Sequence, residues 1–95
     1  MIIIVDIDGT ICKTEGNDYK NSIPIPENIA KINKLFDEGN TIIFWTARGS
    51  TSGKVWRRLT SKQLSKWGCR YDSLKMRKPC YDLFIDDKSK RIEEL

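Results

Sequence analysis

The most informative part of this chain is Ile2-Ile3-Ile4-Val5-Asp6-Ile7-Asp8-Gly9-Thr10. Its first four residues are a continuous apolar run, which predicts a strand buried on both faces. Asp6 and Asp8 follow directly where this strand ends, and Gly9 permits a backbone bend that a side chain would hinder. Of two carboxylates so placed, one is able to attack an electrophile or hold a cation while the other moves protons.

Composition narrows the chemistry that these acids can perform. The chain has 95 residues, which we interpret as one domain spanning 1–95. Histidine is absent, which excludes Ser-His and Cys-His nucleophiles and most zinc sites. Cys12, Cys69 and Cys80 have no C-x-x-C or zinc spacing, as is typical of free thiols in a reducing compartment. Without a signal peptide or an apolar span, the sequence predicts a cytoplasmic protein with no membrane partner.

The positive charge is concentrated in one block. The net charge is +4, but residues 54–78 carry nine basic side chains and one acidic one. Such a block is consistent with an anionic substrate, with nucleic acid, with a protein partner, or with a solvated helix face.

Strands and helices are expected to alternate along the chain. We expect strands at 2–5, 41–45, weakly at 70–74, and at 83–85; helices at about 26–38 and 54–67; a short helical tail from 89; and a loop or flap at 10–25. Trp56 and Trp67 fall on the apolar half of the second helix, which favours core packing over base stacking. This order predicts an α/β, three-layer Rossmann-like fold with a parallel sheet of about four strands, flanked by helices.

Three predicted strand ends carry polar side chains. Asp6, Thr46 and the pair Asp86-Asp87 each follow an apolar strand. Since ligands of open α/β sheets bind at the carboxyl ends of the strands, we expect these residues to meet. An ionised Asp6 is able to attack phosphorus, provided that a hard cation such as Mg²⁺, shared with Asp86, reduces the repulsion between the two anions.

Further residues complete a phosphate site in this interpretation. Lys78 would bind phosphate oxygens as a point charge, and Thr46 with the backbone amide of Ala47 would donate hydrogen bonds to them. Asp8 would protonate the leaving oxygen and then activate water, so we expect its pKa to be raised.

The ordered set Asp6-Ile7-Asp8-Gly9-Thr10, Thr46, Lys78 and Asp86-Asp87 resembles the haloacid dehalogenase-like (HAD) superfamily of phosphatases. This resemblance implies that Asp6 is the nucleophile and Asp8 the acid/base. It also implies that Asp6, the Asp8 carbonyl and Asp86 hold Mg²⁺, with Asp87 near the metal. Lys78 fits the lysine of the motif better than Lys75.

A narrower resemblance concerns the middle and the end of the chain. Trp56-Arg57-Arg58-Leu59-Thr60, Lys78-Pro79 and Ile85-Asp86-Asp87-Lys88 are similar to small members described as capsule- or polysaccharide-biosynthesis phosphatases. Larger members carry a cap domain. Without one, the site is expected to be open, or closed by a second subunit of a homo-oligomer.

The expected function is therefore a Mg²⁺-dependent phosphomonoesterase that uses an aspartyl-phosphate, acting on a small sugar phosphate or a similar metabolite. A nucleotide or polynucleotide-end phosphatase is one alternative. A non-catalytic module that binds phosphate or nucleic acid is another. The order of motifs argues against a receiver-type phosphoacceptor. In that class the acceptor aspartate lies on a middle strand, after an early acid pair, whereas here the acid pair Asp86-Asp87 comes last and the D-x-D motif comes first.

Overall fold

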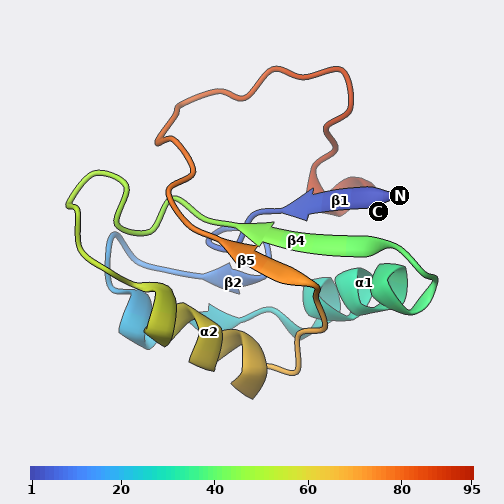
Figure 1. Cartoon of the computed structure of the whole chain (residues 1–95), viewed down its shortest axis with the longest axis horizontal. Coiled ribbons are helices and arrows are strands. Elements are labelled where there is room, and N and C mark those ends of the chain that lie inside the picture. The colour runs from blue at the N-terminus through green and yellow to red at the C-terminus, as the bar shows by residue number, and fades with distance from the viewer.

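A computed structural model describes residues 1–95 and shows a parallel sheet beside two helices (Figure 1). The sheet has three strands, β1 (Ile2–Val5), β4 (Thr41–Trp45) and β5 (Ser73–Lys75), in the order β1-β4-β5. Val5 pairs with Phe44, and Phe44 pairs with Leu74. The predicted α/β fold with a parallel sheet, helices and no cap domain is confirmed. Both helices lie on the same side of the sheet (Figure 1), so the fold has two layers and not the three expected.

Both helices contribute to one hydrophobic core. Helix α1 (Pro26–Asp37) begins with proline in its first turn and buries Ile29 and Ile32. Helix α2 (Arg57–Lys66) begins three residues later than expected and buries Leu64. These side chains join Phe44 and the other buried residues of a single cluster. Of the two helix-flanking tryptophans, Trp67 packs against this cluster as expected.

Only one face of β1 is covered, and the prediction that both faces are buried was wrong. Val5 lies in the core with Phe44 and Leu74, its neighbours across the sheet. Ile2 and Ile4 point to the opposite face, where Ile4 remains 59% exposed. No helix packs on this side of β1, so the side chains that the sequence assigned to a second buried face contact solvent.

The expected strand at Leu83–Ile85 is not formed. This segment belongs to an irregular arch that leaves β5 and passes over the sheet toward β1 (Figure 1), and Ile85 is 86% exposed. No backbone hydrogen bond joins residues 79–90 to the sheet. Leu83, Phe84 and Ile85 all remain exposed and pair with no strand, so the sheet has three strands and not four.

The shorter elements border the carboxyl ends of the strands or complete the chain. Strands β2 (Cys12–Lys13) and β3 (Ile23–Pro24) form a small antiparallel hairpin within the segment 10–25. A 3₁₀ turn, η1 (Tyr19–Asn21), lies between them, and η2 (Ile92–Glu94) replaces the predicted helical tail. None of the helices has the length and apolar character needed to cross a bilayer.

Candidate functional site

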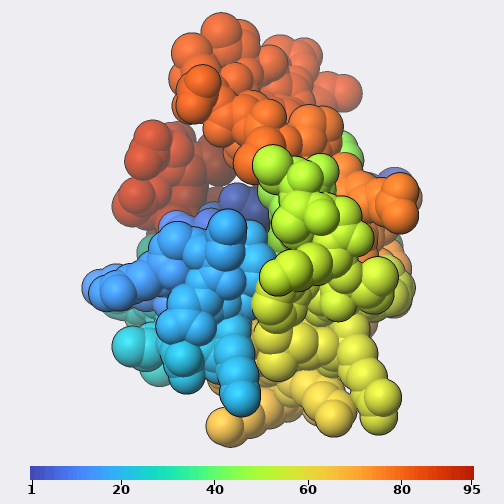
Figure 2. Space-filling model, turned by 90° about the vertical axis from the view of Figure 1, so that its left-hand side faces the viewer, coloured from blue at the N-terminus to red at the C-terminus, as the bar shows by residue number.

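A pocket of about 320 Å³ opens at the carboxyl ends of β1 and β4. Its walls are Asp6, Asp8, Gly16, Tyr19, Thr46, Ala47, Lys78, Pro79, Cys80 and Tyr81. Figure 2 looks onto this end of the molecule, where the dark blue first strand lies at the bottom of a hollow between light blue, lime and orange segments. The structure thus brings five of the predicted site residues together: the two acids of the D-x-D motif, Thr46, Ala47 and Lys78.

Asp6 and Lys78 form the charged centre of the pocket. The Lys78 ammonium lies 3.7 Å from Asp6 Oδ1, and the Lys78 side chain is only 10% exposed. Burial raises the pKa of Asp6, although the attraction of Lys78 and a hydrogen bond from the Ile7 N–H act in the opposite direction. Asp6 is therefore a partly desolvated carboxylate beside a cation, which suits a nucleophile that must meet an anionic group.

The backbone of Lys78 is fixed by two neighbouring loops. Its N–H donates to the Thr46 carbonyl at 2.9 Å, and its carbonyl accepts a hydrogen bond from the Ser50 hydroxyl at 2.7 Å. Its ammonium donates to the Tyr81 hydroxyl at 3.1 Å and lies 4.9 Å from the centroid of that ring. Lys75, the other lysine considered, is exposed at the end of β5 and does not line the pocket. The positions of the two side chains therefore favour Lys78 over Lys75 as the lysine of this pocket.

Asp8 is held by a buried arginine. Arg48 Nε donates to Asp8 Oδ2 at 2.9 Å and Arg48 Nη2 donates to Oδ1 at 2.8 Å, while the Thr14 hydroxyl donates to Oδ1 at 2.6 Å. Burial by itself raises the pKa of Asp8, but the hydrogen bonds from Arg48 and Thr14 outweigh it and the pKa is lowered. The expected upward shift of this pKa was wrong, because no local pattern indicates that a cation pairs with this acid.

Arg48 is the main functional residue that sequence reasoning missed. Its side chain is 0% exposed, and its Nη1 donates to Gln63 Oε1 at 2.6 Å and to the Thr60 hydroxyl at 3.1 Å. Its guanidinium also lies 4.8 Å from the centroid of the Tyr19 ring. One signal was available in the sequence: Gln63 is a polar residue on the apolar half of α2, and a buried amide needs a partner.

Thr46 and Ala47 present hydrogen-bonding groups to the pocket. Thr46 is buried, and its hydroxyl oxygen accepts a hydrogen bond from the Arg48 N–H at 3.2 Å. The hydroxyl hydrogen therefore remains available as a donor. The Ala47 N–H makes no hydrogen bond within the protein. Both groups are able to donate to an anion in the pocket.

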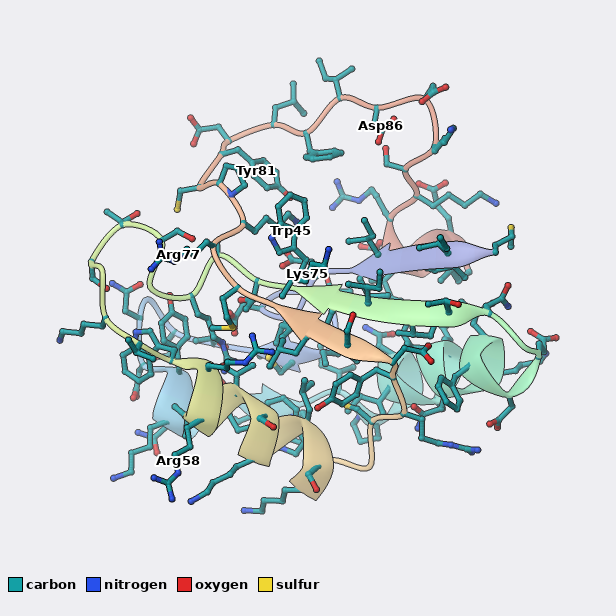
Figure 3. All side chains as sticks on the ribbon, in the orientation of Figure 1. Trp45, Arg58, Lys75, Arg77, Tyr81 and Asp86 are labelled. Atoms are coloured by element: carbon teal, nitrogen blue, oxygen red, sulfur yellow. The ribbon has the colours of Figure 1, made fainter.

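Asp86 and Asp87 are not brought to this pocket. Figure 3 shows Asp86 on the outer arch, beyond β1 and away from Tyr81, and both acids are exposed. No group of three or more acidic, histidine or cysteine side chains has an arrangement that could hold a metal ion. Because the strand expected before them is not formed, the predicted metal set Asp6, Asp8, Asp86 and Asp87 is divided between two places. The side chains at the pocket do not by themselves make a metal cage.

Comparison with solved structures identifies the fold. A target protein from Vibrio cholerae superposes with a TM-score of 0.85 and 28% identity, covering 98% of this chain and 85% of its own. The D,D-heptose 1,7-bisphosphate phosphatase from B. bronchiseptica, crystallised with magnesium and phosphate, gives 0.58 and 21%, covering 79% and 48%. The chain shares the α/β fold of these two proteins.

A third neighbour is similar over a small part of its length. A chain of the Pnkp1/Rnl/Hen1 complex superposes with a TM-score of 0.65 and 23% identity over 94% of this chain, which spans 29% of that neighbour. No protein-family model and no curated protein matches the sequence. At these identities, the likeness to the last two neighbours concerns the fold alone.

Proposed function

We propose that this protein is a phosphomonoesterase that forms an aspartyl-phosphate on Asp6 and acts on a small sugar phosphate or a similar metabolite. One observation carries the proposal: Asp6 lies 3.7 Å from the buried Lys78 in a pocket that also contains Asp8. A solved neighbour with the same fold is described as a phosphatase. A role in capsule or polysaccharide biosynthesis is part of the proposal and rests on the resemblance in sequence.

The reaction would proceed in two displacements. In the first, an Asp6 oxygen forms a bond to phosphorus while the bond to the ester oxygen breaks, and the departing oxygen takes a proton from the protonated form of Asp8 or from water. In the second, water attacks phosphorus, the bond from Asp6 breaks, and Asp8 accepts the proton of the water. Lys78, the Thr46 hydroxyl and the Ala47 N–H would stabilise the phosphoryl oxygens in both steps.

The two steps require different protonation states of Asp8. Arg48 holds Asp8 ionised, which suits its role as the base of the second step. The first step calls for a protonated Asp8, which this ion pair opposes. We therefore infer that the departing oxygen receives less help than the attacking water does, so that the first step depends strongly on the leaving group.

We propose Mg²⁺ as the cofactor. When bound, it would supply positive charge at the phosphate. Magnesium keeps several waters and takes one or two carboxylates together with substrate phosphates. Asp6 is the available carboxylate at the pocket, since both Asp8 oxygens accept hydrogen bonds. Asp86 and Asp87 would help to bind Mg²⁺ only if residues 82–87 moved toward the pocket.

Hydrogen exchange tests this proposed movement without an activity assay. Addition of Mg²⁺ is expected to protect amides of residues 82–87 in the wild-type protein but not in Asp86→Asn/Asp87→Asn. A Glu93→Gln/Glu94→Gln variant removes two exposed charges from the nearby tail and is the matched control. Mg²⁺ that binds without any protection of residues 82–87 would contradict a role for Asp86 and Asp87.

A phosphatase screen tests the proposed function itself. Sugar phosphates, nucleotides and oligonucleotides with terminal phosphates are compared with and without Mg²⁺. Wild-type protein is expected to release phosphate, and Asp6→Asn to release none while its circular dichroism stays unchanged. Acid quenching of wild-type protein during turnover should trap phosphate on Asp6. Equal turnover by Asp6→Asn would refute the assignment of the nucleophile.

A nucleotide or polynucleotide-end phosphatase is the second candidate function. The basic block of residues 54–78 favours it, because nine of its side chains are basic and one is acidic. Binding of nucleic acid without phosphate release would instead support the non-catalytic alternative. A steep dependence of KM on salt for oligonucleotides, absent for sugar phosphates, would favour this second candidate.

A further inference from the structure

A second cavity of about 440 Å³ lies next to the pocket that contains Asp6. It is enclosed by the loop that precedes α2 and by the chain that leaves β5. Pro79 and Cys80 line both cavities, so the two are adjacent. Arg48 forms a second link, because it lines the larger cavity while its guanidinium bonds to Asp8 in the smaller one. A ligand that fills one cavity is therefore able to extend into the other.

The lining of the larger cavity is cationic. Lys54, Arg57 and Arg77 contribute to it, and no acidic residue does. None of these three side chains forms an ion pair within the chain. Arg57 donates one hydrogen bond from Nη2 to the Leu74 carbonyl at 2.9 Å, which fixes this guanidinium at the wall. Three positive charges with no internal counterion make an anion the expected occupant.

The N-terminus of α2 adds to this potential. Its N-cap residue Trp56 and its first residue Arg57 line the cavity, and no side chain caps the helix. The free N–H groups of a first helical turn carry partial positive charge. Apolar surface from Val55 and Met76 accompanies the charges, as expected for a site that also contacts the carbon skeleton of a ligand.

The backbone at Arg77 directs two consecutive cations into the two cavities. Arg77 is the only residue other than glycine with a positive φ, at 64°. Figure 3 shows Arg77 on the chain that leaves β5, beside the loop that precedes α2, and the next residue, Lys78, reaches Asp6. The left-handed conformation is unfavourable for an arginine, and at functional sites such strain is held in place by the surrounding structure.

We propose that the larger cavity binds a second phosphoryl group of the substrate. Resting on the proposed function of the Asp6 pocket, this inference specifies a substrate class: a molecule that carries another phosphate besides the one that is removed. A bisphosphorylated small metabolite and the phosphodiester next to a terminal phosphate of a polynucleotide share this chemistry.

Matched pairs of substrates test the proposal and separate the two sources. Fructose 1,6-bisphosphate is compared with fructose 6-phosphate, and a short oligonucleotide with a 3′-phosphate is compared with the 3′-mononucleotide. In each pair, only one member has a second phosphoryl group. We expect kcat/KM to be at least about tenfold higher for that member in one pair, as a charge-assisted hydrogen bond would give.

Two double variants with the same change in net charge distinguish the site from general electrostatics. Lys54→Gln/Arg77→Gln removes cations from the cavity. Arg58→Gln/Lys62→Gln removes cations from exposed positions of α2 that line neither cavity, and Figure 3 shows Arg58 pointing away from the sheet. The first variant should abolish the preference for the second phosphate, so that kcat/KM becomes equal for the two members of a pair. The second variant should retain the preference.

Direct binding separates a failure of this proposal from a failure of the proposed function. Titration of inorganic pyrophosphate into the wild-type protein is followed by calorimetry, with no turnover needed. Binding that weakens about tenfold or more in Lys54→Gln/Arg77→Gln, and not in Arg58→Gln/Lys62→Gln, supports the site even if no substrate is hydrolysed. Equal weakening in both variants, or no preference for a second phosphate in an active enzyme, would overturn it.

Discussion

Arg48 binds both carboxylate oxygens of Asp8, with Nε–Oδ2 and Nη2–Oδ1 distances of 2.9 and 2.8 Å. The pair joins the loop after β4 to the loop after β1. Through Gln63, Arg48 also fixes α2, and Gln63 in turn donates to the Tyr19 carbonyl at 2.6 Å. A single ion pair thus holds together three segments around the pocket and sets the protonation of the acid that we assign to proton transfer.

Replacement of Asp8 by alanine should destabilise the protein strongly. Arg48 would remain as a buried cation without its counterion, a situation that costs about 3–5 kcal/mol. Urea unfolding at pH 7 measures the loss. Because the folded pKa of Asp8 is lowered, its contribution to stability is present above the ordinary pKa of 3.8 and lost as pH falls through the folded pKa. The difference between wild type and Asp8→Ala should therefore shrink in acid.

Asp37→Ala is the control for this measurement. It removes the partner of Arg70 from an ion pair in which both side chains are about half exposed. Exposed pairs contribute about 0–1 kcal/mol, so little stability should be lost. A loss of similar size in both variants would show that the burial of Arg48 is not what makes its ion pair important.

The pH dependence of activity should reflect Asp6. Its ionised form is the nucleophile and its pKa is raised by burial, so kcat/KM should fall on acidification at a pH above 3.8. Lys78→Met removes an attraction that favours ionised Asp6. The acidic limb of the pH profile of kcat/KM should therefore move to higher pH. Lys75→Met removes an exposed lysine outside the pocket and should leave the limb in place. An identical limb in Lys78→Met and wild type would argue against Asp6.

Turnover should depend strongly on the leaving group. Because Arg48 keeps Asp8 ionised, an alkoxide receives little proton donation, whereas a phenolate needs little. Aryl phosphates should therefore exceed alkyl phosphates in kcat/KM by about 10²-fold or more, which is the usual contribution of a general acid. In Arg48→Gln this ratio should decrease. A wild-type protein that hydrolyses both classes equally would show that Asp8 does protonate the departing oxygen.

Gly49 should tolerate no side chain. Its φ is +80°, and a Cβ there would overlap the carbonyl oxygen of Lys54 across the loop. Gly49→Ala should therefore destabilise the protein by more than the ~1 kcal/mol typical of positive φ alone. Gly53 has a φ of +74° but open space around it, so Gly53→Ala is the matched control. Thermal unfolding of both variants separates the cost of the steric overlap from the cost of the positive φ. Equal losses of stability in the two variants would exclude the overlap as the cause.

The three cysteines should react at very different rates. Burial raises the pKa of the Cys12 and Cys69 thiols to about 11, which leaves little thiolate at neutral pH. Cys80 is exposed and lines both cavities. Iodoacetamide should therefore modify Cys80 first, and phosphate should slow this modification by occupying the adjacent pocket. Mass spectrometry locates the label, and modification of Cys12 before Cys80 would contradict the described burial.

Helix α1 and the strands at 2–5 and 41–45 could be predicted from local pattern. Proline in the first turn and the spacing of Ile29 and Ile32 specify α1 without help from the rest of the chain. The pattern at Leu83–Ile85 is equally apolar but too short to be decisive. Whether it forms a strand depends on a pairing partner far away in the sequence, which local propensity does not provide.

Local sequence patterns are enough to predict the parallel strands and the meeting of Asp6, Asp8 and Thr46 at one edge of the sheet. These features follow from apolar runs that end on polar residues. Three other features depend on the tertiary structure: Arg48 neutralises Asp8, Lys78 and not Lys75 reaches Asp6, and Asp86 lies elsewhere. Each of these depends on the burial and approach of residues distant in the chain, and free energies of desolvation and pairing are set by that three-dimensional environment.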